Sequence, residues 1–126
     1  MTERIIGIDL GTTNSLAATV FDQVGPEAIT EHGQTPIIPS VLTMRDGKWL
    51  GGQEALIRSL QNPTQTLYSI KRLMGRSLEE IPVEEQAQLS YQLRSGERGQ
   101  VLVCLGEQAF TPQEISAEIL KSVKYR

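Results

Sequence analysis

The chain of 126 residues has the length of one small domain and a globular composition, with 39% hydrophobic and 21% charged residues. Its net charge of −3 is spread over mixed signs without a basic run, which argues against nucleic-acid and polybasic membrane sites. The sequence shows no bilayer-spanning apolar run, no signal peptide and too few cysteines for a disulfide or a zinc site. We therefore expect a soluble, cytoplasmic protein that binds neither nucleic acid nor membrane.

The first forty residues predict a hairpin followed by an irregular stretch. Apolar and β-branched runs predict strands at residues 5–9, 15–21 and 28–30, the first of them buried. Residues 11–14 form a turn between the first two strands, and residues 24–26 form a loop. The glycine and two prolines between residues 32 and 39 favour a connection without regular structure.

The middle of the chain predicts hairpins and short helices. We expect strands at residues 41–44, 48–50, 90–94, 100–105 and 109–110, and helices at residues 53–60 and 66–74. Asp46-Gly47 is a favoured dipeptide of a type I′ hairpin turn. The helix over residues 66–74 follows from apolar residues at helical spacing, with Gly75 placed to end it. The acidic residues 77–88 predict a helical turn and then a loop around Pro82.

The last segment carries a clear helix start. Thr111 is a good N-cap, Pro112 suits the first helical position, and Glu114 completes a capping box. An apolar stripe follows at Ile115, Ile119, Leu120 and Val123. No glycine, asparagine or proline ends this helix before residue 126, so we expect the chain to be part of a longer protein.

The strongest chemical signal is the segment from Asp9 to Asn14. A carboxylate at the end of a strand is followed at once by a glycine turn with two threonines and an asparagine. Glycine permits close backbone approach, and successive turn amides form an anion-binding concavity to which threonine hydroxyls add donors. Asp9 suits a bound Mg²⁺, held through water because magnesium dehydrates reluctantly. The alternative is a tight hairpin in which Asp9 only accepts turn hydrogen bonds.

Two common nucleotide motifs are absent from this segment. It lacks the lysine and the glycine spacing of a P-loop, and it lacks the Gly-x-Gly-x-x-Gly dinucleotide fingerprint. A phosphate site here would therefore be of another type.

Three segments resemble the heat-shock 70 (DnaK-type) molecular chaperones. Residues 6–15 are similar to the first phosphate hairpin of that family, which actin and sugar kinases share in a looser form. Asn62-Pro63 with residues 66–76, which end in Lys-Arg-Leu-Met-Gly-Arg, resembles a second family segment, and residues 113–121 resemble a third. The three occur in family order and at family spacing over nearly the whole chain, and the second favours the chaperones over actin and sugar kinases.

The resemblance implies roles for six residues. Gly11, Thr12, Thr13, Asn14 and Lys71 would bind the phosphates of ATP or ADP, and Asp9 would orient the water shell of Mg²⁺. Lys71 would also be catalytic, reaching the γ-phosphate and the attacking water. Without the resemblance, Lys71 reads as an ordinary solvated lysine. Arg72 is either a partner of acidic groups near the site or an exposed charge, and Arg76 reads as structural.

The resemblance also implies an architecture and an activity. The fold would be an α/β, actin-like or ribonuclease-H-like ATPase fold, of which this chain would be an incomplete first lobe. Residues 1–39 and 111–126 would belong to its core subdomain, and residues 40–110 to a peripheral insertion. In the full-length protein, ATP hydrolysis would drive binding and release of extended polypeptide clients, with a J-domain co-chaperone and a nucleotide-exchange factor as partners. Alone, the chain would be inactive.

Residues 33–40 depart from the usual family pattern. The family has Gly-x-Arg-x-Thr-Pro-Ser, whereas this chain lacks the arginine and carries Ile37-Ile38 before Pro39-Ser40. A related Leu-Leu-Pro-Ser version occurs in the iron–sulfur-assembly branch of the family. The alternatives are therefore that branch, an actin-like superfamily sugar kinase, or a non-catalytic module that retains the hairpin.

Some singular residues favour ordinary structural roles. His32 reads as a surface histidine and Cys104 as a core residue rather than a reactive thiol. Trp49 fits either a core or a partner surface. The acidic residues Glu79, Glu80, Glu84 and Glu85 read as a solvated surface, with contact to a nucleotide-exchange factor as the alternative.

Overall fold

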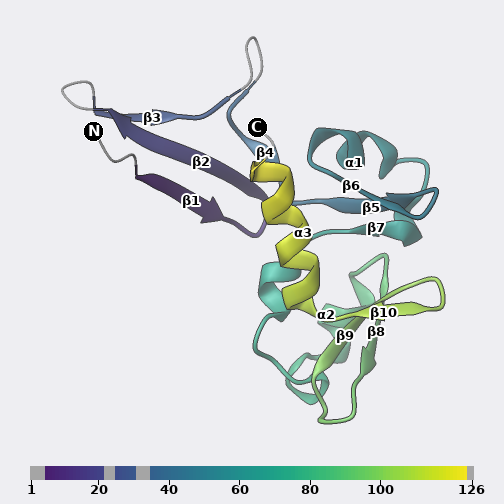
Figure 1. Ribbon diagram of the computed structural model, residues 1–126. Helices are drawn as coiled ribbons and strands as arrows, with labels where there is room; N and C mark the ends of the chain where they lie inside the picture. The colour runs from purple at the N-terminus through teal and green to yellow at the C-terminus, as the bar shows by residue number, and fades with distance from the viewer. Residues whose placement is uncertain (1–4, 22–24, 31–34, 125–126) are drawn as a thin grey trace.

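The computed structural model describes residues 5–21, 25–30 and 35–124, and it arranges three antiparallel sheets around helix α3 (Pro112–Lys124) (Figure 1). Helix α3 contacts strands of all three sheets and the short 3-10 helix η2 (Ile70–Leu73). The chain is thus a mixed α/β structure. No helix among the described residues has the length and hydrophobicity needed to cross a membrane.

The first sheet contains the predicted hairpin. Strands β1 (Ile6–Leu10) and β2 (Asn14–Phe21) pair in register from Ile6 opposite Thr19 to Leu10 opposite Ser15. Strand β3 (Gly25–Ala28) pairs with the far end of β2, and the two-residue strand β4 (Ile38–Pro39) pairs with its beginning. The third strand therefore begins within the predicted loop at residues 24–26 and ends before Ile29. His32 lies outside the described residues.

The expected burial of the first strand is wrong. Ile5, Ile6 and Ile8 are 74%, 58% and 54% exposed. Strand β1 is the edge of the described sheet, and the helix packs beside it over β2, where Ala17 clusters with Val123. The strand itself forms because β-branched residues suit a pleated surface, but burial depends on what packs against it.

The second sheet has the order β6-β5-β7. Strands β5 (Leu42–Arg45) and β6 (Lys48–Gly51) are joined by Asp46 and Gly47, whose φ angles of 52° and 77° confirm the type I′ turn. Helix α1 (Gln53–Arg58) follows, in agreement with the sequence. Strand β7 (Thr66–Leu67) comes after the 3-10 helix η1 (Pro63–Gln65) and pairs with β5.

The helix predicted over residues 66–74 is wrong. Thr66 and Leu67 are extended because they pair with Thr43 and Leu42, and only residues 70–73 form a 3-10 helix, η2. The apolar residues whose spacing suggested an α-helix are buried in another way. Leu67 is buried as part of the second sheet, and Ile70 and Leu73 are buried as part of η2. Tertiary pairing has thus overridden the helical pattern of this segment.

The third sheet contains the three strands predicted between residues 90 and 110, as β8 (Gln92–Ser95), β9 (Val101–Leu105) and β10 (Gln108–Phe110), with β9 in the middle. Strand β8 begins at residue 92 rather than at residue 90. Before it lie the 3-10 helix η3 (Leu78–Glu80), which matches the predicted helical turn, and helix α2 (Val83–Ala87). Pro82 is the N-cap of α2 rather than the centre of a loop, since proline is tolerated at helix starts. Cys104 is half-buried, on the face of β9 opposite the buried Val103.

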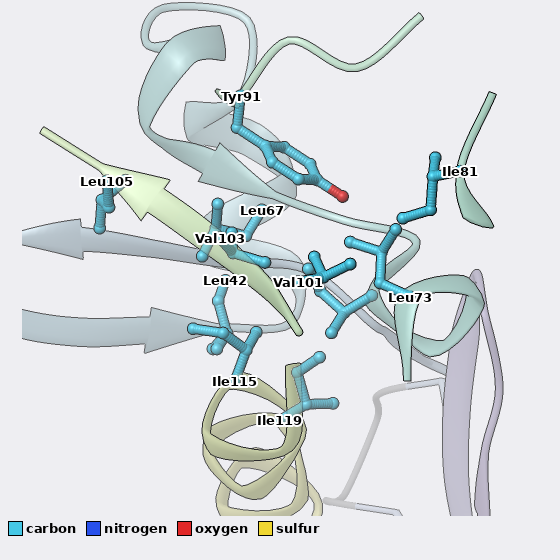
Figure 2. Close-up of a cluster of buried hydrophobic side chains, with 11 residues drawn as sticks. Leu42, Leu67, Leu73, Ile81, Tyr91, Val101, Val103, Leu105, Ile115 and Ile119 are labelled. Carbon is cyan, nitrogen blue, oxygen red and sulfur yellow. The ribbon is translucent and has the colours of Figure 1, made fainter. Parts of the chain in front are cut away.

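The main core lies where α3 meets the second and third sheets (Figure 2). It contains Leu42, Leu67, Ile70, Leu73, Ile81, Tyr91, Val101, Val103, Leu105, Ile115 and Ile119. The capping box of α3 is confirmed, because Glu114 N–H donates to the Thr111 hydroxyl at 3.1 Å and Thr111 N–H donates to the Glu114 carboxylate at 3.2 Å. Leu120 is only half-buried. The division at residues 39/40 and 110/111 stays a prediction.

Candidate functional site

The candidate site begins with the loop that joins β1 to β2. Gly11 N–H donates a hydrogen bond to the Asn14 carbonyl at 3.1 Å and closes the turn. A Cβ atom on Gly11 would overlap that same carbonyl oxygen. The loop therefore needs glycine at this position because the backbone crosses itself too closely for a side chain.

The segment that follows β4 holds the loop in place through hydrogen bonds. Ser40 N–H donates to the Thr13 carbonyl at 2.8 Å. The hydroxyls of Ser15 and Ser40 lie 2.7 Å apart and hydrogen-bond each other in the interior. Ser40 thus anchors the Thr13 carbonyl of the loop and, through Ser15, the strand that follows the loop.

The donor groups of the loop point to a binding role. Among the described residues, neither the backbone N–H groups nor the hydroxyls of Thr12 and Thr13 have a hydrogen-bond partner. Thr13 and Asn14 are exposed, and Gly11 and Thr12 are half-buried. Adjacent backbone amides with nearby hydroxyls can jointly bind an anion by donating hydrogen bonds to it.

Asp9 supplies a carboxylate next to this loop. It is exposed, lies opposite Leu16 in the hairpin and precedes Gly11 by two residues. In the part of the chain that the structure describes, no three histidine, cysteine, aspartate or glutamate side chains gather into a metal-binding group. One carboxylate without a protein cage fits Mg²⁺ held mainly by water and phosphate, and it does not fit an all-protein site.

Lys71 lies on η2, separated from the loop in sequence but bordering the same core. It is exposed together with Arg72, whereas Ile70 and Leu73 on either side are 2% and 3% exposed. Leu10, between Asp9 and Gly11, packs against the cluster that contains Ile70 and Leu73. The structure therefore joins the loop and η2 through the core, with no ion pair or hydrogen bond between Lys71 and the loop among the described residues.

The two arginines near Lys71 differ in their contacts. Arg76 forms an ion pair with Glu85 at 3.2 Å and donates to the carbonyls of Arg72 and Glu80 at 3.1 and 2.9 Å. The structural role expected for Arg76 is thus confirmed. Arg72 is exposed and has no ion pair with a described side chain.

Sequence reasoning missed the residues that hold the site from beneath. The Ser15–Ser40 pair and the buried hydroxyl of Tyr91 lie in segments with no periodicity that links them.

Trp49 packs edge-to-face on Phe110, with ring centroids 5.1 Å apart, which accounts for its half-burial.

A comparison with known proteins covers this whole arrangement. The family model described as Hsp70 protein matches residues 5–126. The match includes Asp9, the loop, η2 and α3, so all residues of the candidate site lie within it.

Proposed function

Because the chain belongs to the Hsp70 family, we propose that it forms part of the nucleotide-binding lobe of a chaperone ATPase. Proteins of this family generally bind nucleotide with Mg²⁺, hydrolyse ATP and work with polypeptide clients and co-chaperones. The observation that carries the proposal is the anchored loop at residues 11–14, in which the backbone N–H groups and the hydroxyls of Thr12 and Thr13 have no hydrogen-bond partner among the described residues.

We assign the β- and γ-phosphates of ATP to Gly11, Thr12, Thr13 and Asn14. The N–H groups and hydroxyls of Thr12 and Thr13 and the side chain of Asn14 would donate to phosphate oxygens, while the Gly11–Asn14 and Ser40–Thr13 hydrogen bonds keep the turn in shape. Gly11 lets the backbone remain in this close turn.

Asp9 would hold the metal that accompanies the nucleotide. Mg²⁺ supplies charge neutralisation for the phosphates when bound. The carboxylate of Asp9 would accept hydrogen bonds from metal-bound water, which suits an exposed aspartate beside a loop rather than inside a cage.

Lys71 would act on the reacting phosphate. An ammonium group close to the γ-phosphate and the attacking water lowers the cost of the negative charge that develops during transfer. The short helix η2 presents Lys71 outward while its apolar neighbours are fixed in the core.

In a longer protein that also carries a second phosphate-binding loop and a peptide-binding domain, hydrolysis would switch clients between weak and tight binding. The proposal includes an actin-like fold, the subdomain division 1–39 with 111–126 against 40–110, a cytoplasmic location, and a J-domain co-chaperone and exchange factor as partners. Residues 37–40, Ile-Ile-Pro-Ser, keep the iron–sulfur-assembly branch as the alternative within the family. The family match favours a general chaperone and the iron–sulfur-assembly branch over a sugar kinase.

Single-turnover hydrolysis of Mg-ATP by the full-length protein tests the proposal. Replacing Lys71 by alanine should slow hydrolysis by about 10²–10³-fold, the usual effect of removing one transition-state donor. Lys48→Ala is the matched control, since Lys48 is an exposed lysine on β6. An unchanged rate in Lys71→Ala would overturn the assigned role. The 126-residue chain alone should show weak nucleotide affinity and little turnover. Rapid hydrolysis by it would contradict the proposal that hydrolysis needs further parts of a longer protein.

A further inference from the structure

The residue that introduces η2 has an unusual backbone conformation. Ser69 has a φ of 55° and a ψ of 31°, in the left-handed region that residues other than glycine rarely adopt. Its carbonyl accepts from Arg72 N–H at 3.3 Å and so opens the 3-10 turn that carries Lys71. Such conformations persist where the surrounding structure imposes them. The contacts on either side of Ser69 therefore decide where Lys71 lies.

The contact on the N-terminal side comes from Tyr91. Its hydroxyl donates to the Tyr68 carbonyl at 2.6 Å, immediately before Ser69. Tyr91 is 3% exposed, and Figure 2 shows its hydroxyl end directed to the side of the cluster where Leu73 and Ile81 lie. Burial, with a smaller contribution from Tyr68, raises the pKa of Tyr91 above its ordinary value, so the hydroxyl remains a donor.

The side chain of Tyr68 makes contacts of its own. Its hydroxyl accepts a hydrogen bond from Ser90 N–H at 3.1 Å, and the two tyrosine rings pack edge-to-face with centroids 5.3 Å apart. The pair thus makes two hydrogen bonds of different consequence. The Tyr91 hydroxyl holds the backbone before Ser69, whereas the Tyr68 hydroxyl holds residue 90.

The contact on the C-terminal side is the core. Ile70 and Leu73 are three residues apart, so they lie on one face of a 3-10 helix, and both are buried. Lys71 and Arg72 must then face outward, as their exposure confirms. Arg76 also donates to the Arg72 carbonyl at the C-terminal end of η2. The backbone at Tyr68 and Ser69 sets the position of the N-terminal end, next to Lys71.

We propose that Tyr91 is a positioning residue, which sets the location of Lys71 through its hydrogen bond to the Tyr68 carbonyl. This inference rests on the proposed function of Lys71 at the γ-phosphate. The hydroxyl acts at a distance: it touches no nucleotide, and its removal shifts η2 rather than any group of the loop at residues 11–14.

A double-mutant cycle in the full-length protein tests the coupling. Tyr91→Phe keeps the ring and removes the donor, and it should slow single-turnover hydrolysis of Mg-ATP about five- to tenfold, the loss expected for one hydrogen bond. In a Lys71→Ala background the same change should add less than a twofold loss, because Tyr91 acts only through Lys71. Tyr68→Phe is the matched control, which removes one hydroxyl from the same pair and should change the rate less than twofold.

A measurement without nucleotide separates this inference from the proposed function. Amide hydrogen exchange in the full-length protein without nucleotide should rise about fivefold at Arg72 and Met74, whose N–H groups close η2, in Tyr91→Phe but not in Tyr68→Phe. Unchanged exchange at both amides overturns the positioning role, as do full additivity with Lys71→Ala or equal losses in the two tyrosine variants. If Lys71→Ala itself is silent while exchange responds, the function of Lys71 fails and the inference about catalysis falls with it.

Discussion

The hydroxyls of Ser15 and Ser40 form a buried hydrogen bond of 2.7 Å between the second strand of the hairpin and the segment that leads into β5. Both serines are at most 2% exposed. Since Ser40 N–H also holds the Thr13 carbonyl, one residue fixes the loop through its backbone and the strand through its side chain.

Ser40→Ala should lower the free energy of unfolding by about 1–3 kcal/mol, because it leaves the buried Ser15 hydroxyl without its partner. The double variant Ser15→Ala with Ser40→Ala should cost less than the sum of the single variants, since no hydroxyl is then left unpaired. Urea unfolding of the four proteins measures this coupling. Strict additivity would show that the pair contributes nothing as a pair.

Gly11→Ala should distort the loop, because its Cβ would overlap the Asn14 carbonyl. We expect a destabilisation of about 1–3 kcal/mol, typical of overpacking, and a loss of Mg-ATP affinity in the full-length protein. Gly7→Ala is the control: Gly7 lies in β1 with open space at its Cβ position. It should change stability by less than about 0.5 kcal/mol. Equal effects in urea unfolding and calorimetric titration would remove the special role of Gly11.

The pKa of Glu80 is lowered by hydrogen bonds from the backbone N–H of Ser77 and then from its hydroxyl, at 3.1 and 3.0 Å. Because the folded-state pKa lies below the ordinary value near 4.5, the two hydrogen bonds stabilise the folded chain fully at pH values above 4.5. Their contribution to the free energy of unfolding is lost as the pH falls through the lowered pKa. Ser77→Ala should raise the pKa of Glu80 by removing the hydroxyl donor. Carboxyl carbon NMR titration measures the pKa, with Ser95→Ala as the control, and an unchanged titration would mean that the Ser77 hydroxyl does not donate to Glu80 in solution.

Ile115→Ala should destabilise the chain by about 2–5 kcal/mol, since Ile115 is fully buried where α3 meets the core. Leu60→Ala is its counterpart, because Leu60 is 89% exposed, and it should stay within about 0.5 kcal/mol. Thermal unfolding compares the two. If Leu60→Ala were as costly as Ile115→Ala, the packing of α3 described above would be wrong.

Much of the fold was predictable because its signals are local. Asp46-Gly47 favours a type I′ turn, Thr111 with Glu114 forms a capping box, and a continuous run of apolar residues predicts β9. Of the candidate site, the loop at residues 11–14 was evident from glycine and hydroxyl residues in a turn. Lys71 was found only through a family resemblance, since an exposed lysine has no distinctive local pattern.

By itself the sequence determined the hairpins, the capping box of α3 and the loop with its donors, because these depend on interactions between residues a few positions apart. Only the tertiary structure decided that Leu67 would pair with Leu42 rather than join a helix, and that Ile6 and Ile8 would be exposed. It also decided that Tyr91 would hold the backbone before Ser69. These outcomes depend on which surfaces meet across long sequence separations, where packing and hydrogen bonds outweigh local preference.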